Sequence, residues 1–311
     1  MKVGFIGLGG IGKPMAIHVA KSGFDLTVTD LREPPLKELE QHGARIAGSA
    51  REVAAASEIV LASLPSNEAS EQVALGSDGV LAGAKSGDIY IELSTISPEV
   101  VHTIAGRAAE KGVTVLDAPV SGSLEQRRQG TLSIMAGGDA KALARAMPVL
   151  KAFGDKIYHV GDTGAGATVK LVNNLLAGIN MVATMEALVL GVKGGLSVQT
   201  LKEVISASSG SSKVFDGMVD LITTRSSEPP PGQTADMGLH TIAKDVKLAA
   251  ELAQNLSVPL LLGSSAVQAF LAGLAHGWAD KENWVLMELF EQLSATRVRP
   301  PNLTNSKESK T

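Results

Sequence analysis

A glycine-rich turn close to the N-terminus constrains the fold of this chain more than any other feature. Residues 7–12 read G-L-G-G-I-G, which is the pattern G-x-G-x-x-G. The apolar run 3–6 precedes the turn, a stretch with helical periodicity follows at 14–22, and a second apolar run ends in an acid at 26–30. Alone, the glycine pattern is weak evidence. In the order strand, turn, helix and strand, it indicates a βαβ unit that binds a dinucleotide.

Each glycine of the turn has a steric reason. Gly7 permits the tight turn out of the strand, Gly9 lets the backbone approach a pyrophosphate, and Gly12 lets the helix pack closely on the strand. The helix N-terminus presents free N–H groups and a positive dipole end to the phosphates. The alternative is a turn that uses glycine without binding a ligand. The predicted cofactor-binding residues of the turn are Gly7, Gly9, Gly10, Ile11 and Gly12.

The residues after the second apolar run bear on which dinucleotide is bound. Asp30 is placed to accept hydrogen bonds from the adenosine ribose, and its charge would repel a 2′-phosphate. This favours NAD over NADP. Arg32 is the feature that argues for NADP, which therefore stays possible. We count Asp30, Leu31 and Arg32 among the cofactor-binding residues.

Length and composition exclude several classes of protein. The 311 residues favour two domains, and 44% hydrophobic residues can bury a sizeable core. A net charge of −4 without a basic block argues against a nucleic-acid partner. No cysteine is present, which excludes disulfides and thiol catalysis. Without an uncharged apolar run of membrane length or a signal peptide, we expect no membrane association and a cytoplasmic location.

Residues 1–163 alternate strand-like and helix-like segments, which predicts an α/β domain with a doubly wound parallel sheet. Ligands of such sheets bind at the carboxyl ends of the strands. The expected strands cover residues 2–7, 25–30, 59–65, 88–94, 114–118, 132–137 and 156–160.

The pattern changes after residue 163. An apolar stretch from 167 to about 193 predicts one long helix that is buried on most sides. Only helical segments follow, so we expect residues 164–295 to form an all-helical domain. The expected helices cover residues 197–206, 213–223, 235–255, 260–275 and 282–293. The polar tail 296–311 has little to bury, and we expect it to be disordered.

Four segments together are similar to motifs of the β-hydroxyacid dehydrogenase family. They are residues 7–16 (GLGGIGKPMA), 117–122 (DAPVSG) with 130–135 (GTLSIM), 164–174 (GAGATVKLVNN) and the pair Lys244-Asp245. The resemblance covers residues 1 to about 295. It implies a Rossmann domain, a long interdomain helix and a helical second domain. It also implies interconversion of a β-hydroxyacid and its aldehyde or keto acid with NAD or NADP.

Lys170 is the candidate catalytic residue. It is a lysine on an otherwise apolar face near the start of the predicted buried helix. Burial and the positive helix end both lower a lysine pKa, which brings it into range for proton transfer near neutral pH. In the family, the matching lysine donates a proton to the carbonyl oxygen as hydride arrives. The alternative is a lysine that extends to solvent from a partly exposed helix.

Asn174 lies four residues after Lys170 and therefore projects from the same helix face. Its amide could hold the substrate or the Lys170 ammonium. The alternative role is helix capping or a hydrogen bond between helices. Asn173 points elsewhere, and we assign it no role.

The loop Ser121, Gly122 and Ser123 follows a strand-like segment at the expected ligand edge. Its small residues leave room for a substrate, and its N–H and hydroxyl groups can bind a carboxylate. A plain turn is the alternative. The family's motif usually has a second glycine where Ser123 stands, although some reductase members also carry serine there. Arg127 and Arg128 follow as solvated loop charges, or as a contact to a second anionic group of the substrate.

The resemblance adds further cofactor residues. Leu64, Pro65 and Thr95 match positions that line the ribose and nicotinamide, although an asparagine often present in the family is replaced by Ala69. Lys244 matches a position that contacts the cofactor from the helical domain, and Asp245 would orient it or the helix. The alternative is an exposed ion pair on a helix.

No histidine spacing suggests a metal site, and we expect no metal. We expect a small anionic hydroxyacid or aldehyde acid as substrate, and a homodimer or homotetramer because the helical half has apolar surface to bury. Two alternatives remain: an imine reductase on the same fold, which usually lacks the lysine, and a non-catalytic NAD-binding protein. Lys170 disfavours the first, and intact Lys170 and Asn174 disfavour the second.

Overall fold

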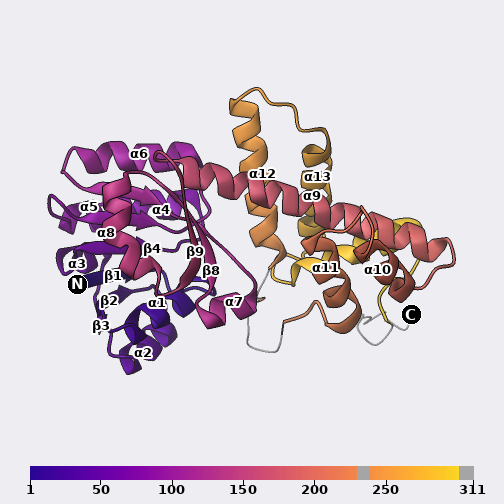
Figure 1. The fold of residues 1–311 in the computed structure, drawn as a ribbon, viewed down its shortest axis with the longest axis horizontal. Helices are drawn as coiled ribbons and strands as arrows, with labels where there is room; N and C mark the ends of the chain where they lie inside the picture. The colour runs from indigo at the N-terminus through magenta and orange to yellow at the C-terminus, as the bar shows by residue number, and fades with distance from the viewer. Residues whose placement is uncertain (230–234, 236–237, 301–311) are drawn as a thin grey trace. The chain divides into compact units, whose positions relative to one another are not determined.

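The structure is a computed structural model that describes residues 1–229, 235 and 238–300. The chain divides into two compact units, of which the first is Met1–Leu171 and the second begins at Val172 (Figure 1). We describe each unit by itself.

The first unit contains a nine-stranded sheet in the order β3-β2-β1-β4-β5-β6-β8-β7, with β9 beside β8. The six strands β1 to β6 are parallel to one another, as the sequence predicts. The strands are β1 (Lys2–Ile6), β2 (Asp25–Thr29), β3 (Arg45–Ile46), β4 (Ile59–Ala62), β5 (Ile89–Glu92), β6 (Thr114–Asp117), β7 (Val120–Ser121), β8 (Leu132–Gly137) and β9 (Gly154–Gly161).

One edge of the sheet differs from the predicted parallel arrangement. β8 runs antiparallel to both β6 and β7, and β9 then runs parallel to β8. Residues 122–131, which connect β7 to β8, are too few for the crossover that a parallel pair needs. The two-residue strand β7 is also too short to show an alternating pattern in the sequence.

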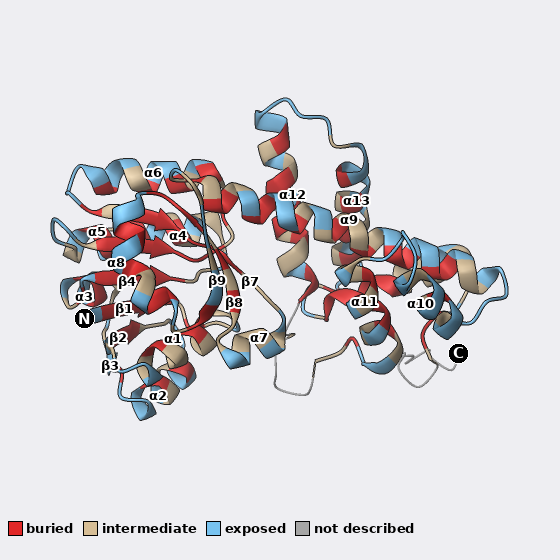
Figure 2. Cartoon of the chain, in the orientation of Figure 1, coloured by how far each residue is buried: buried red, intermediate tan, exposed pale blue. Residues whose placement is uncertain are grey.

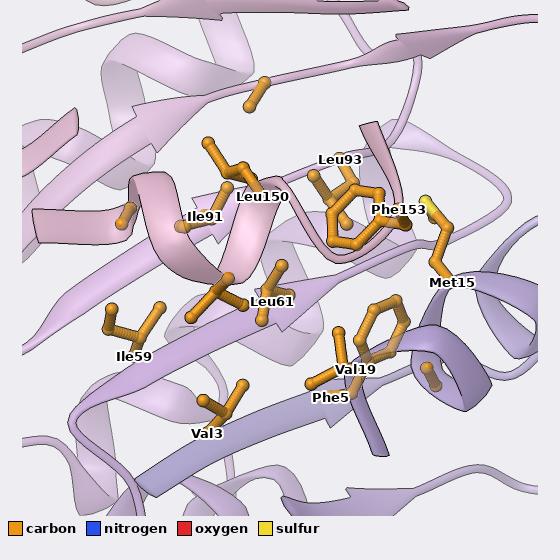
Figure 3. Close-up of a cluster of buried hydrophobic side chains, with 14 of the residues drawn as sticks. Val3, Phe5, Met15, Val19, Ile59, Leu61, Ile91, Leu93, Leu150 and Phe153 are labelled. Carbon is orange, nitrogen blue, oxygen red and sulfur yellow. The ribbon is translucent and has the colours of Figure 1, made fainter. Parts of the chain in front are cut away.

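Helices cover both faces of the sheet, which makes it doubly wound. On one face, Phe5, Met15 and Leu150 belong to one cluster of buried side chains (Figure 3). On the other face, Val60 packs with Ile104. Figure 2 shows the inner strands of the sheet buried and the outer faces of the helices exposed, whereas the edge strands β3 and β9 are largely exposed or half-buried. The helices of this unit are α1 (Gly12–Lys21), α2 (Glu33–Gln41), α3 (Ala50–Ala55), α4 (Asn67–Leu75), α5 (Val80–Gly83), α6 (Pro98–Ala109), α7 (Leu124–Gln129) and α8 (Ala140–Leu150).

The long helix α9 (Ala165–Lys193) starts in the first unit and continues into the second. Among the described residues it is the one helix long and apolar enough to cross a membrane. Met185 and Leu188 are fully buried in the core of the second unit, whereas Val172, Leu176 and Leu190 of the same helix are exposed. The expectation that this helix is buried on most sides is therefore wrong, because only part of its surface packs against the core.

The described residues of the second unit form helices and no strands, as expected. The helix expected at 235–255 begins at Leu239, and the segment expected as one helix at 282–293 splits into a 3-10 turn and a short α-helix. The elements after α9 are α10 (Val198–Ser206), α11 (Lys213–Thr224), α12 (Leu239–Asn255), α13 (Leu261–Ala275), η1 (Asn283–Leu286) and α14 (Met287–Ser294).

The start of the expected disordered tail differs from the sequence-based prediction. Arg299 is buried and forms ion pairs with Glu288 at 2.8 Å and with Glu291 at 3.0 Å. The N–H groups of Val298 and Arg299 also donate to Glu291 Oε1. A polar tail gives no sequence signal for such pairing, because arginines of a tail are ordinarily solvated. Residues 301–311 lie outside the described residues.

Candidate active site

The glycine turn has the geometry that the sequence predicts. Gly7 has φ +86°, and a Cβ added to it would lie 2.3 Å from the Ser63 carbonyl oxygen. A Cβ on Gly12 would lie 2.0 Å from the Gly7 carbonyl oxygen, whereas Gly9 has open space around it. No side chain caps the start of α1, and its first turn contains no acid. A turn with accessible backbone at an uncapped helix start fits the pyrophosphate of a dinucleotide.

Asp30, which follows β2, holds the glycine turn in place. Its Oδ2 accepts the N–H of Leu8 at 2.6 Å, and its Oδ1 accepts the backbone N–H of Arg32 at 2.8 Å and Nε at 3.0 Å. Burial opposes ionisation of this carboxyl, but the hydrogen bonds from Arg32 and Leu8 prevail and lower the pKa of Asp30. Leu31, between the two charged residues, is fully exposed.

The ion pair between Asp30 and Arg32 changes the argument on coenzyme choice. The residue that favours NAD and the residue that favours NADP are bonded to each other, and Arg32 Nη2 also donates to the Leu8 carbonyl at 3.0 Å. The arginine charge offsets part of the repulsion that Asp30 would exert on a 2′-phosphate. Asp30 therefore discriminates against NADP less strongly than an isolated carboxylate would.

A buried network joins the ends of β4 and β5, where Leu64, Pro65 and Thr95 are predicted to contact the cofactor. Ser94 Oγ accepts the N–H of Leu64 at 2.7 Å, and the Ser94 N–H donates to Glu92 Oε1 at 2.9 Å. The two adjacent strand ends are therefore held in a fixed spacing. Ser94 serves here as a bridge inside the protein rather than as an exposed ligand group.

Glu92 is the buried centre of this network, and sequence reasoning did not identify it. Its Oε2 accepts the Tyr90 hydroxyl at 2.8 Å. Burial raises the pKa of Glu92, against the opposing effect of hydrogen bonds from Ser94, Tyr90 and Ser70. Burial and the nearby carboxylate likewise raise the pKa of Tyr90. The available signal was the period-two spacing of Tyr90, Glu92 and Ser94 in an otherwise apolar strand.

Asp117 is a second buried carboxyl that sequence reasoning assigned only to a motif. Its Oδ1 accepts the N–H of Gly164 at 2.8 Å, and its Oδ2 accepts the N–H of Ala167 at 2.7 Å. Burial raises the pKa of Asp117, although the N–H groups of Ala167, Gly164 and Gly166 act in the opposite direction. The carboxyl thus joins the end of β6 to the first turn of α9.

The loop after β7 is more constrained than its small residues suggest. Ser123 caps α7 in a capping box: Ser123 Oγ accepts the Gln126 N–H at 3.2 Å, and the Ser123 N–H donates to Gln126 Oε1 at 2.9 Å. A Cβ on Gly122 would lie 2.6 Å from Leu132 Cδ2. The N–H of Ser123 is therefore occupied, which leaves its hydroxyl hydrogen for the predicted contact to a carboxylate. The roles of Ser121, Gly122 and Ser123 in substrate binding stay predictions.

The two arginines of α7 lie in different surroundings. Arg128 lines a surface hollow of about 340 Å³ along α1, together with Lys13, His18 and Lys21. The Arg128 carbonyl also lies 3.0 Å from His18 Nε2. This places Arg128 on the α1 side of the helix. Arg127 is half-buried, and its contact to a second anionic group of the substrate stays a prediction.

Lys170 lies in the second turn of α9 and is only 8% exposed. This burial argues against the alternative of a lysine that extends to solvent. Leu171 beside it is fully buried, and Val169 is exposed, so the helix face that carries Lys170 is an interior one. A buried lysine at this position is suited to transfer a proton, whereas a lysine whose only role is to contact solvent would be exposed.

One turn further along α9, Asn174 is buried and donates from Nδ2 to Asp245 Oδ2 at 2.6 Å. Asn173 Nδ2 donates to Asn174 Oδ1 at 2.9 Å, so Asn173 has a role that we did not expect. Lys244 Nζ lies 3.0 Å from Asp245 Oδ1. Because Asp245 is buried, the alternative of an exposed ion pair is wrong: Asp245 joins Lys244 of α12 to Asn174 of α9.

In the described residues, no three or more side chains among histidine, cysteine, aspartate and glutamate come together as potential metal ligands. That no metal is bound stays a prediction from the sequence.

Comparison with known proteins agrees with this fold. Residues 2–161 match the NAD binding domain of 6-phosphogluconate dehydrogenase, and residues 164–290 match the NAD-binding domain of NADP-dependent 3-hydroxyisobutyrate dehydrogenase. The chain is 40% identical to 2-(hydroxymethyl)glutarate dehydrogenase of Eubacterium barkeri, with 96% of this chain and 97% of that protein covered. It is 39% identical to 3-hydroxyisobutyrate dehydrogenase of Pseudomonas aeruginosa, with 90% and 94% covered.

A solved structure described as 3-hydroxyisobutyrate dehydrogenase from Salmonella typhimurium has a TM-score of 0.81 and 30% identity, and 93% of this chain and 99% of that chain are covered. The fold and the site define an oxidoreductase that uses NAD, with NADP possible, and acts on the CH–OH group of a hydroxyacid. The chain belongs to the β-hydroxyacid dehydrogenase family. The predicted family, fold class, enzyme class and cofactor are thereby confirmed.

Proposed function

We propose that the protein interconverts a small β-hydroxyacid and its aldehyde or keto acid, with Lys170 as the general acid and base. The burial of Lys170 in the second turn of α9 is the observation that carries this proposal. The names of the relatives support hydroxyacids such as 3-hydroxyisobutyrate, 2-(hydroxymethyl)glutarate and L-serine as substrates to test.

The bound nicotinamide would accept or supply the hydride. In oxidation, neutral Lys170 Nζ takes the proton of the substrate hydroxyl, and in reduction the ammonium returns it to the carbonyl oxygen. Asn174, whose amide is oriented by Asp245, would hold the substrate or Nζ in place. Ser121, Gly122 and Ser123 would bind the substrate carboxylate.

The protein's own residues also position the cofactor in this proposal. The glycine turn would receive the pyrophosphate at the start of α1, and Asp30 would meet the adenosine ribose. Leu64, Pro65 and Thr95 would line the ribose and nicotinamide, and Lys244 would contact the cofactor from α12. The network around Glu92 supports this proposal, because it fixes the two strand ends that carry Leu64 and Thr95.

We also propose that the protein assembles as a homodimer or homotetramer and acts in the cytoplasm. Exposed leucines on α13 support self-association: Leu261 is 84% exposed and Leu262 is 70% exposed. The proposal of a cytoplasmic location is supported by composition alone.

The central test is Lys170→Ala. We expect kcat to fall by about 10²- to 10⁴-fold, the usual contribution of a general acid or base, while NADH affinity measured by nicotinamide fluorescence stays unchanged. Lys193→Ala is the matched control, because Lys193 lies on the same helix, binds the Ser294 carbonyl and has no proposed role in chemistry. Wild-type kcat in the Lys170 variant would refute the assignment.

A substrate panel tests the wider proposal. Initial rates would be measured on 3-hydroxyisobutyrate, L-serine, 2-(hydroxymethyl)glutarate, glycerate and 4-hydroxybutyrate, with NAD and NADP in parallel. We expect turnover of at least one hydroxyacid. Turnover of cyclic imines but of no aldehyde acid would identify an imine reductase, and NADH binding without any turnover would identify a non-catalytic binding protein.

A further inference from the structure

The first turn of α9 is seated on the end of β6 by one carboxyl group. Asp117, the last residue of β6, is almost fully buried, and each of its carboxylate oxygens accepts a backbone N–H of the helix start. Oδ1 accepts from Gly164 at 2.8 Å, and Oδ2 accepts from Ala167 at 2.7 Å. Two charge-assisted hydrogen bonds to consecutive parts of one turn fix its position and its orientation.

The start of α9 and strand β8 pack closely against Asp117, so the helix cannot shift toward or away from the sheet without a clash or a lost contact. A Cβ on Gly166 would lie 2.2 Å from the Met135 carbonyl oxygen and 2.4 Å from the Asp117 carbonyl oxygen. A Cβ on Gly137, which pairs with Asp117 across the sheet, would lie 2.6 Å from Asp117 Oδ1. Glycine at both positions lets the helix and the neighbouring strand approach the carboxyl group directly.

The same turn is held from a third side. Ala167 is buried against Ile96 and Val101, which belong to the segment that leads from β5 into α6. The Thr168 hydroxyl donates to the Gly164 carbonyl at 2.8 Å and closes the turn. The start of α9 is therefore held rigidly in place, and Asp117 is the one charged residue among the contacts that hold it.

The chain connects the start of α9 and Asp117 directly to the predicted catalytic lysine and to the predicted carboxylate-binding loop. Lys170 follows Ala167 by three residues, a rise of about 4.5 Å along a helix. In the other direction, Ser121 follows Asp117 by four residues through β7. Movement of the Asp117 carboxyl would therefore move the predicted proton-transfer group relative to the predicted carboxylate-binding loop.

We propose that Asp117 is a positioning residue that sets where the Lys170 amine stands relative to the loop Ser121–Ser123. Asp117 acts through the backbone of α9 and does not itself transfer a proton. This inference rests on the proposed role of Lys170.

The experiment compares Asp117→Asn with the wild-type protein. An asparagine keeps the size but offers only one acceptor oxygen for two N–H groups. Hydrogen exchange of the segment 164–170, measured without cofactor, is expected to become faster. We expect kcat on the best hydroxyacid of the panel to fall about tenfold or more, because misplacement by a fraction of an ångström is costly to proton and hydride transfer. The dissociation constant of NADH, measured by fluorescence, is expected to change less than about twofold, because the glycine turn and Asp30 belong to other strands.

Asp139→Asn is the matched control. Asp139 caps α8 in the same unit by accepting the N–H of Ala142 at 2.8 Å, but α8 carries no predicted site residue. This variant is expected to lower the melting temperature and leave kcat at the wild-type value. Wild-type kcat in a folded Asp117→Asn variant, or an equal loss of kcat in both variants, would overturn the inference.

A double variant tests whether Asp117 acts through the lysine. If it does, Asp117→Asn combined with Lys170→Ala is no slower than Lys170→Ala alone, whereas independent effects would multiply. Full activity of Lys170→Ala would contradict the proposed function itself. If Lys170→Ala lowers kcat and Asp117→Asn lowers it further by its own full factor, only the role of Asp117 is contradicted.

If Asp117→Asn does not fold, Asp117→Glu gives a second test. It keeps the charge and moves the carboxylate by one methylene group. The expected result is again a lower kcat with unchanged NADH affinity, and wild-type kcat in this variant would count against the inference.

Discussion

A single carboxyl inside the sheet links local hydrogen bonding to the pH dependence of stability. Glu92 is fully buried beside Tyr90 and Ser94, and burial raises its pKa above the ordinary value of 4.5. The folded protein therefore holds the Glu92 proton more tightly than the unfolded chain does. The contribution of this group to stability is present below the ordinary pKa and is lost as the pH rises toward the raised value.

The raised pKa of Glu92 leads to a prediction for Glu92→Gln. The variant lacks the ionisable group, so its melting temperature relative to wild type is expected to be higher at pH 8 than at pH 5. Calorimetry at both pH values would measure it, and an unchanged difference between the two proteins would contradict the stated pKa direction.

The two buried carboxyls also show why residue-scale sequence reasoning was incomplete. Glu92 and Asp117 lie at the ends of neighbouring strands. Glu92 bonds to Tyr90 and Ser94, two positions away on either side, whereas the N–H groups that Asp117 accepts lie 47 and 50 positions away. An acid in an apolar run is visible in the sequence. Which N–H groups it will meet depends on how the strand ends and the next helix come together.

At the scale of elements, the glycine turn, the inner strands and α9 were predictable because their signals are local and periodic. The antiparallel β8 was not, because β7 is two residues long and its pairing depends on the preceding strand. The link of Asn174 to Asp245 was not predictable either, since it joins two helices whose packing no single helix pattern reveals.

The pairing of α9 with α12 leads to a prediction about charge. Asn174→Asp would set a second carboxylate about 2.6 Å from that of Asp245, and like charges at that distance in a buried site repel strongly. We expect a loss of stability of about 2–4 kcal/mol. Adding Asp245→Asn restores an amide–carboxylate pair with its direction reversed, and we expect it to recover most of the loss.

Denaturant unfolding of the two single variants and the double variant would measure this coupling. Asp245→Asn alone removes the negative partner of Lys244 and serves as the comparison for the cycle. A double variant as unstable as the sum of the two single changes would show that Asn174 and Asp245 do not interact in solution. Turnover of the restored double variant would then show whether the orientation of the Asn174 amide matters for activity.

At the scale of the whole molecule, the second unit has more apolar surface than its own core uses. Its core gathers fully buried side chains such as Met185, Leu188 and Val246. Leucines on the outside of two of its helices stay exposed: Leu190 of α9 is 76% exposed, and Leu261 and Leu262 of α13 are more than two-thirds exposed. Exposed leucines that cluster on α13 favour contact with a second copy. Each Å² of apolar surface buried in such a contact would contribute about 25 cal/mol of stabilisation.

Replacement of these leucines tests the assembly. Leu261→Glu combined with Leu262→Glu would set two charges in a contact formed by α13, and we expect the mass measured by light scattering to fall toward that of a monomer. Gln254→Glu adds one charge at an exposed site of α12 without removing apolar surface and is expected to leave the mass unchanged. Circular dichroism separates dissociation from unfolding. Because both leucines lie outside the core, a folded double variant with the wild-type mass would show that α13 is not part of the assembly contact.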